Sequence, residues 1–172
     1  MFYNCSSLSE INLSRFYFYK IKDMSNAFSQ CNSLTSIIVT KYGFFMNNLE
    51  KMDSTFTNCT KLKEIDLSNI DTSKVTSFEN MFSGCESLES LNLLKFNTKK
   101  VQNMSNMFYK CKSLTSINLS NFDINKVLNI DNMLTSCPPL KYIDIRKFNG
   151  TEMQLNKMFN GLDGEGMNDY CK

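Results

Sequence analysis

The chain has 172 residues, of which 42% are hydrophobic, and a net charge of +2; this composition is typical of one globular domain. Its 19 basic and 17 acidic residues are mixed along the length, which argues against a nucleic-acid-binding surface or a polybasic membrane patch. No apolar run is long enough to span a bilayer, the first residues lack the pattern of a signal peptide, and the absence of histidine excludes Cys-His and Ser-His catalysis and most catalytic zinc sites within this chain.

The sequence repeats with a period of about 26 residues, as repeat architectures do. One unit reads MFYKCKSLTSINLSNFDINKVLNID, from Met107 to Asp131. Six units, starting near residues 1, 27, 55, 81, 107 and 133, cover most of the chain, and a partial seventh begins at residue 158. We therefore expect a single solenoid domain over residues 1–172. The columns that define the units are Cys5, Cys31, Cys59, Cys85, Cys111 and Cys137; Phe2, Phe28, Phe56, Phe82, Phe108, Leu134 and Phe159; Leu8, Leu34, Leu62, Leu88, Leu114 and Leu140; and Phe16, Tyr42, Ile70, Phe96, Phe122 and Phe148.

The first part of each unit predicts a short, half-buried strand. In LTSINLSNF, apolar Ile117 and Leu119 alternate with polar neighbours, as on a strand with one buried face. The spacing L-x-x-L-x-L is that of leucine-rich repeats. The predicted strands are centred on Asn12, Ile38, Asp66, Asn92, Asn118 and Asp144, and their inward pairs are Ile11/Leu13, Ile37/Val39, Ile65/Leu67, Leu91/Leu93, Ile117/Leu119 and Ile143/Ile145.

The next part of each unit has a different period and predicts a short helix or 3₁₀ segment. Val101, Met104, Met107, Phe108 and Cys111 stand at positions i, i+3, i+6, i+7 and i+10, which places them on one helical face. Polar residues such as those at 71–73 can turn the chain and cap the start of the segment. Stacked units of this kind predict a right-handed, curved α/β solenoid of strand-turn-short-helix units with a parallel sheet on one face.

These columns resemble the BspA-like leucine-rich repeat family, also called 26-residue-repeat surface proteins. The family unit reads M-F-x-x-C-x-S-L-x-x-L-x-L-S-x-F-x-T-x-x-V-x-x-M. The resemblance extends over nearly the whole chain and implies a non-catalytic, surface-displayed interaction or adhesion module, at the cell surface or extracellular, without naming a ligand. Unit four matches the pattern at Met81, Phe82, Cys85, Ser87, Leu88, Leu91, Leu93, Phe96, Thr98, Val101 and Met104.

Unit two departs from the pattern, because VTKYGFFMNNLEKM adds two residues to it. We expect residues 41–48 to bulge from the solenoid, since Gly43 permits a turn. Phe44 or Phe45 is then a candidate exposed binding residue, or one of them refills the apolar column that the shifted unit leaves. The opening phrase MFYNCSSL also reads as an interior unit, which favours a fragment of a longer protein over a natural end that caps by dimerising.

The cysteine column has three interpretations. Metal binding is disfavoured, because the column has neither C-x-x-C clusters nor histidine. Disulfides are disfavoured, because helices about 10 Å wide would separate neighbouring units. Small buried thiols fit best, with Cys171 of the tail as the expected exposed thiol.

The carboxylates predict no catalytic site. Glu64 and Asp66 lie on the same face of one predicted strand, but a paired-carboxylate hydrolase needs a cleft and one raised pKa. The repeat pattern builds no cleft there, so a solvated face is the favoured interpretation. We expect no catalytic residue, no metal ligand and no cofactor.

The exposed positions between the buried pairs are the expected binding face. They are mostly small and polar, and the main exceptions are Tyr142 and Arg146 in unit six, with apolar Ile38 and Leu94 as lesser ones. Because Tyr and Arg are typical anchors of interfaces, we expect any local anchor near Tyr142, Asp144 and Arg146. The expected partner is a protein or surface glycan, bound weakly or multivalently, with no nucleic acid and no membrane insertion. The alternatives are an accessory segment of a larger enzyme or regulatory protein, a structural spacer, and a solvated repeat face without a partner.

Overall fold

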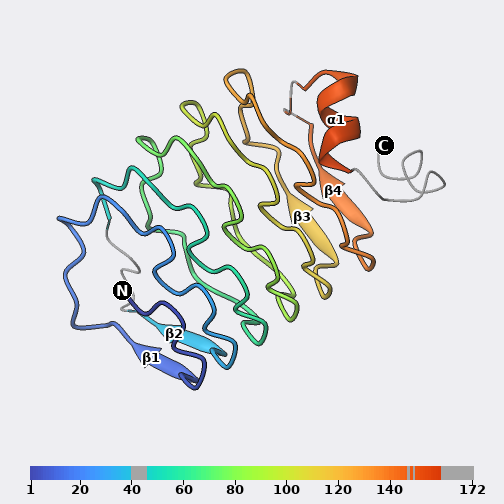
Figure 1. Cartoon of the computed structure of the whole chain (residues 1–172). Helices are drawn as coiled ribbons and strands as arrows, with labels where there is room; N and C mark the ends of the chain where they lie inside the picture. The colour runs from blue at the N-terminus through green and yellow to red at the C-terminus, as the bar shows by residue number, and fades with distance from the viewer. Residues whose placement is uncertain (40–45, 147, 149, 160–172) are drawn as a thin grey trace.

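The computed structural model describes residues 1–39, 46–146, 148 and 150–159. Its coils stack side by side from the blue N-terminal end to the red helix at the other end (Figure 1), as a solenoid does. Residues 41–45 of the predicted bulge, with Phe44 and Phe45, and the predicted exposed thiol Cys171 lie outside the described residues.

The strand side of the solenoid carries four short parallel strands. These are β1 (Glu10–Asn12), β2 (Ser36–Ile38), β3 (Ser116–Asn118) and β4 (Tyr142–Asp144). β1 pairs with β2 and β3 with β4, so that two separate two-stranded sheets lie at opposite ends of the stack (Figure 1). Four of the six predicted strands are thereby confirmed, although each is centred one residue before its predicted centre, at Ile11, Ile37, Ile117 and Ile143.

The predicted strands centred on Asp66 and Asn92 are wrong, because neither stretch is a strand in the described chain. Between residues 63–69 and 89–95, which are all described, one backbone hydrogen bond is formed, from the Glu89 N–H to Lys63 O at 3.1 Å. A parallel ladder needs a regular series of such bonds. Instead of the predicted continuous six-stranded sheet, the solenoid has one pair of strands at each end and no paired strands in its centre.

The inward direction of the predicted apolar pairs is confirmed, because none of their side chains is exposed. Most are buried, and the remaining ones are half-buried against the same core. The buried members are Leu13, Ile65, Leu67, Leu93, Ile117, Leu119 and Ile143.

The opposite side of the solenoid is built of tight turns, so the predicted short helices of the units are wrong. In unit five, the Tyr109 N–H donates to the carbonyl of Asn106 (3.1 Å). Alternate N–H groups instead cross to the next unit, as Asn106 does to Asp131 (2.9 Å) and Phe108 to Met133 (2.9 Å). The turns repeat every few residues along the chain, which produces the same spacing of buried residues as a helix would.

Positive φ angles explain why these segments do not form helices. Two residues four positions apart in each full turn segment take the left-handed conformation, which interrupts a right-handed helix and which Asn and Gly adopt most readily. We call the side of the solenoid that these tight turns build the turn side. Its left-handed residues are Asn26 and Gln30, Ser54 and Asn58, Asn80 and Gly84, Asn106 and Lys110, and Asn132 and Ser136.

One α-helix, α1 (Glu152–Met158), ends the described stack, and it lies where the repeat predicts the short helix that follows the strand of unit six. It begins with a capping box, in which the Thr151 side chain accepts the N–H of Gln154 (3.2 Å) and the Gln154 side chain accepts the N–H of Thr151 (2.9 Å). The N–H of Leu134 donates to the carbonyl of Met158 (3.0 Å). The helix therefore continues the inter-unit ladder of the turn side.

The phenylalanine column forms a stack of parallel rings through the middle of the solenoid. Successive ring centroids lie 5.4–5.6 Å apart, from Phe2 through Phe28, Phe56 and Phe82 to Phe108. This spacing is that of stacked aromatic pairs. The expectation that helices about 10 Å wide separate the units is therefore wrong. In the column that begins at Phe16, that residue is itself exposed, whereas Ile70, Phe96 and Phe122 are buried.

The cysteine column joins each unit to the one before it. From Cys31 onward, each thiol donates a hydrogen bond to the carbonyl of the phenylalanine in the preceding unit, whereas Cys5 of the first unit is only half-buried. Burial raises the pKa of the Cys59 thiol to about 12 and that of Cys137 to about 11. The interpretation as small buried thiols is confirmed for this set, and the Sγ to O distances run Cys31 to Phe2 3.0 Å, Cys59 to Phe28 3.1 Å, Cys85 to Phe56 3.1 Å, Cys111 to Phe82 3.3 Å and Cys137 to Phe108 3.1 Å.

Candidate binding surface

The exposed face of the strand side presents mostly small and polar side chains, as the alternation predicts. Ser36, at the outward start of β2, donates its hydroxyl to the carboxylate of Glu10 on β1 (3.2 Å). Three larger side chains interrupt the polar columns, namely Ile38, Leu94 and Tyr142, and all are exposed. A partner that contacts this face therefore meets few apolar anchors.

Unit six brings the predicted residues Tyr142, Asp144 and Arg146 together. Asp144 is only 4% exposed, because its carboxylate lies under the guanidinium of Arg146. Nε of Arg146 donates to Oδ1 at 3.0 Å and Nη2 donates to Oδ2 at 2.7 Å, which is the two-point geometry of a strong Arg–carboxylate pair. The side chain of Arg146 nevertheless remains 80% exposed.

The electrostatics of the pair agree with its geometry. The hydrogen bond from Arg146 lowers the pKa of the Asp144 carboxyl, and the same bond raises the pKa of Arg146. Both groups are therefore charged at neutral pH. Asp144 holds Arg146 in place, while Tyr142, 59% exposed, and the guanidinium form the part of the cluster that solvent reaches.

A hollow of about 410 Å³ opens in the centre of the strand side. It lies where units two, three and four lack a continuous ladder, so the expectation that no cleft forms beside Glu64 and Asp66 is wrong. No feature of the sequence indicates this hollow, because these units show the same alternation of apolar and polar residues as the units whose strands pair. The residues that line the hollow are Ser36, Ile37, Glu64, Ile65, Asp66, Ser90, Leu91 and Asn92.

The chemistry of this hollow favours binding over acid catalysis. The Ser68 hydroxyl and backbone N–H lower the pKa of the Asp66 carboxyl, and the N–H to Oδ1 distance is 2.9 Å. Asp66 is thus ionised at neutral pH and accepts hydrogen bonds rather than supplying a proton. Its carboxylate, together with the hydroxyls of Ser36 and Ser90 and the amide of Asn92, offers hydrogen-bonding groups to a polar ligand.

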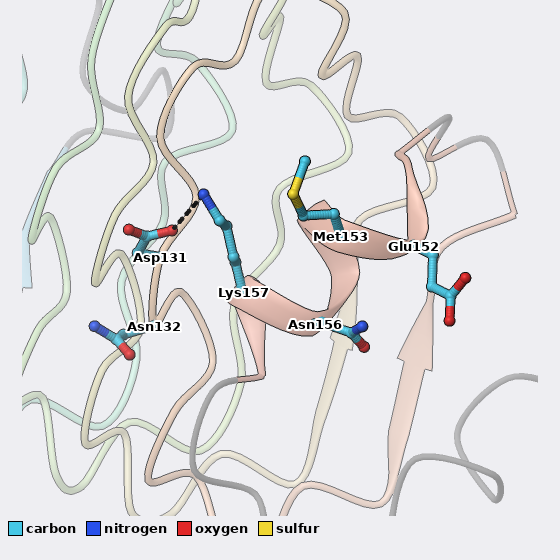
Figure 2. A pocket seen from close by; sticks show the side chains of 6 residues that line it. All are labelled: Asp131, Asn132, Glu152, Met153, Asn156 and Lys157. Carbon is cyan, nitrogen blue, oxygen red and sulfur yellow. Dashed lines mark ion pairs between the residues drawn. The ribbon is translucent and has the colours of Figure 1, made fainter.

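A second hollow, of about 620 Å³, lies between α1 and residues Asp131 and Asn132 at the end of unit five (Figure 2). Lys157 points toward Asp131, with Nζ 3.9 Å from Oδ1, whereas Glu152 points away from both. The two carboxylates therefore do not converge on one point. In residues 1–39, 46–146, 148 and 150–159, no three His, Cys, Asp or Glu side chains form a group that could hold a metal ion.

A family profile described as "Mycoplasma protein of unknown function, DUF285" matches residues 1–91 and 50–167. These two matches overlap and together include all six full units. No curated protein matches the chain. Among the residues that the structure describes, no helix has the length and apolar character required to cross a membrane.

Two solved structures resemble the chain. A leucine-rich repeat protein from Bacteroides ovatus is 21% identical, with a TM-score of 0.55 over 78% of this chain and 33% of that chain. A leucine rich cell surface protein from Faecalibacterium prausnitzii is 18% identical, with a TM-score of 0.39 over 90% of this chain and 55% of that one. The chain thus spans about a third of the first protein. The structural likeness to that protein supports the predicted leucine-rich repeat fold. The chain belongs to the family described as Mycoplasma proteins of unknown function, DUF285, and folds as a leucine-rich repeat solenoid.

Proposed function

We propose that the chain is a non-catalytic interaction module of a surface protein, which binds a protein partner through the exposed face of its strand side. The resemblance of its units to 26-residue-repeat surface proteins supports the location. The hydrogen-bonding backbone of the turn side is largely used between units, whereas the strand side keeps its outward side chains free. The strand side is therefore the surface better suited to a ligand.

The observation that carries this proposal is the arrangement of Tyr142, Asp144 and Arg146. Binding energy at protein interfaces concentrates in Tyr, Trp and Arg side chains. The two hydrogen bonds that Arg146 donates to Asp144 hold its guanidinium in one orientation, so that less side-chain freedom is lost on binding. Tyr142 and Arg146 are the contacting residues in this proposal, and Asp144 is a positioning residue.

A glycan is the second candidate ligand, and the central hollow favours it. Its volume of about 410 Å³ lies within the range of about 300–1,000 Å³ typical of small-ligand sites. Hydroxyl, amide and carboxylate groups of Ser90, Asn92 and Asp66 could bond to sugar hydroxyls. With either ligand, a single module binds weakly, and tandem copies of the surface strengthen binding by multivalency.

The test is a binding screen of the purified chain on an array of defined extracellular-matrix proteins and oligosaccharides. For a protein ligand, Tyr142→Ala with Arg146→Ala should weaken binding roughly tenfold or more, equivalent to about 1.4 kcal/mol or more. The matched control is Tyr3→Ala with Lys61→Ala, which removes an exposed tyrosine and a lysine outside the strand segments. Circular dichroism verifies that each variant is folded.

The variants separate the remaining hypotheses. An oligosaccharide that binds in the hollow should respond to Asp66→Asn and Asn92→Ala, and only weakly to the unit-six variant. Unchanged affinity in both sets would remove the strand side as the binding surface. A chain that binds nothing on the array would favour a spacer or an accessory segment of a larger protein.

A further inference from the structure

The corner that follows β1 carries a run of aromatic and basic residues that the strand-side proposal does not use. Residues 15–20 read RFYFYK. Tyr17 is 87% exposed, Tyr19 56% and Phe16 55%, whereas Phe18 is buried. In Figure 1 this blue segment lies at the outer N-terminal end of the stack.

Other units have a different side chain at this corner. Asp71 of unit three accepts the N–H of Ser73 (2.9 Å), and Asn97 of unit four accepts the N–H of Lys99 (3.2 Å), each with its own side chain. This is the side-chain turn that Asx residues favour. In the repeat register, Tyr17 occupies the position of Asp71 and Asn97.

The backbone confirms that register. The N–H of Ile21 donates to the carbonyl of Phe18 at 2.9 Å, as the N–H of Val101 does to that of Thr98 at 2.9 Å. Unit one therefore follows the same turn with different side chains. It lacks the Asx turn at this corner and presents an aromatic ring instead, and such local departures from a repeating pattern concentrate at functional positions.

The exposure of the two tyrosines is not a consequence of their place at the end of the stack. Asp71 and Asn97, the counterparts of Tyr17, are exposed although their units have neighbours on both sides. The same holds for Lys99 of unit four, the counterpart of Tyr19. Phe16 differs, since its counterparts Phe96 and Phe122 are buried. A further coil stacked on unit one would cover Phe16 but would leave Tyr17 and Tyr19 in solvent. Another repeat of the solenoid is therefore not the partner that these two rings would meet.

The corner is also basic. Residues 13–22 contain Arg15, Lys20 and Lys22 and no acidic residue. Lys22 pairs with Glu50 at 3.0 Å, whereas no ion pair within the described residues involves Arg15 or Lys20. The Nζ of Lys20 lies 5.7 Å from the centre of the Tyr19 ring, within the reach of a cation–π contact. We call Arg15, Phe16, Tyr17, Tyr19 and Lys20 the corner patch.

We propose that the corner patch is a second docking surface, separate from the strand side, which binds an acidic segment of a partner protein. Its exposed tyrosines and arginine are the residue types that anchor protein interfaces. Its two unpaired cations, Arg15 and Lys20, complement carboxylates and steer the approach of an acidic segment. A lipid surface fits less well, because polybasic membrane sites use clusters of about 4–8 cations.

The probe is a phage-displayed library of random dodecapeptides, selected on the immobilised wild-type chain after depletion on the variant Tyr17→Ser with Tyr19→Ser. Peptides that survive are synthesised and titrated by fluorescence anisotropy. We expect them to be rich in Asp and Glu and to bind the double variant at least tenfold more weakly. Arg15→Glu with Lys20→Glu should weaken them by a similar factor, since it reverses the charge of the patch.

Two controls separate this surface from the strand side. Tyr3→Ser removes another exposed tyrosine and should leave the titration unchanged. Tyr142→Ala with Arg146→Ala should do the same, even if that variant loses the strand-side ligand. Cooperative thermal melts verify that all variants fold.

Several results would overturn the proposal. These are a selection that enriches nothing, enriched peptides without acidic residues, and equal binding to the wild-type chain and the tyrosine variant. Tighter binding to phosphatidylcholine vesicles with phosphatidylserine, or to an oligothymidylate strand, than to the selected peptides would assign the patch to a membrane or to nucleic acid instead.

Discussion

The turn side and the strand side of the solenoid are held together very differently. On the turn side, backbone bonds, cysteine–carbonyl bonds and stacked rings connect successive units through most of the stack. On the strand side, ladders join β1 to β2 and β3 to β4, and the centre is open. Stability therefore resides mainly on the turn side. The strand side is freer to vary its surface for binding, because fewer inter-unit bonds depend on it.

The largest expected effect comes from the centre of the ring stack. Phe82 is fully buried and lies between Phe56 and Phe108, with centroids 5.5 and 5.6 Å away. Phe82→Ala should lower the free energy of unfolding by roughly 3–5 kcal/mol. Leu91→Ala, at a half-buried position of the strand side, should lower it by less than the roughly 2–5 kcal/mol of a buried leucine. Urea unfolding of both variants checks the comparison, and equal losses would contradict it.

A smaller effect is expected at a turn-side glycine. Gly84 has a φ of +73°, and a Cβ added there would meet the side chain of Asn58. Gly84→Ala should destabilise the chain by roughly 1–2 kcal/mol, since alanine is unfavourable in the left-handed region. The matched control, Ser90→Ala on the exposed strand side, should change stability by less than about 0.5 kcal/mol. If Gly84→Ala left the free energy of unfolding unchanged, the turn side would tolerate the left-handed alanine, against this prediction.

The two sides should also respond to opposite extremes of pH. Burial raises the pKa of Cys59 to about 12, above the ordinary thiol value of about 8.5. The native state therefore retains a proton that the unfolded chain releases, so this stabilisation is complete below about pH 8.5 and is lost as the pH rises toward 12. Cys59→Ala should be less stable at pH 8 but should lose less stability between pH 8 and pH 11. Identical pH slopes in urea titrations of the two proteins would refute this assignment.

Acid should act instead on hydrogen-bonded carboxylates, and Asp66 and Asp144 are those of the strand side. Hydrogen bonds lower the pKa of Asp66 and Asp144, so their stabilisation is present above the unfolded value of about 3.9 and is lost as the pH falls through the lower folded values. Asp144→Asn should therefore reduce the loss of stability below pH 4. Urea titrations at pH 3 and pH 6 measure how much stability each protein loses on acidification, and Glu10→Gln is the control variant.

The smallest expected effect concerns the corner of unit one, which joins the two sides. Tyr17→Asp restores the residue type that forms the Asx turn at Asp71. The new carboxylate should accept the N–H of Tyr19 and stabilise the chain by about 0.5 kcal/mol, while weakening peptide binding at the corner patch. Thermal melts compared with Tyr17→Ser measure the gain. A Tyr17→Asp variant that is no more stable than Tyr17→Ser would show that the new carboxylate does not form the turn.

Several features of the fold could be predicted because they depend on local periodicity. The alternation around Ile117 and Leu119 predicted β3 in place and direction, and the columns of Phe82 and Cys85 predicted the buried axis. The turn side was misassigned because three-residue turns bury side chains at the same spacing as a helix. The repeated asparagine at Asn80, Asn106 and Asn132 was the available signal, since asparagine tolerates the left-handed conformation that ends a helix.

The candidate sites were predictable to a lesser degree. Tyr142 and Arg146 stood out as large residues in small polar columns, but the hydrogen bonds that place Asp144 beneath Arg146 depend on the local geometry after β4. The run RFYFYK stands in the sequence, but the repeat pattern alone does not show that it is a surface patch. That conclusion depends on the exposed residues at the same corner in units that have neighbours on both sides. Phe44 and Phe45 remain predictions.

The amino-acid sequence by itself determined the repeat, the number of full units, the buried columns and the direction of the strand side chains, because a period and an alternation are properties of the chain. Only the tertiary structure decided which units pair as strands, how closely the coils approach and where a hollow opens. These outcomes depend on the backbone bonds between residues that are one repeat apart, and units with the same alternation of side chains can form those bonds or lack them.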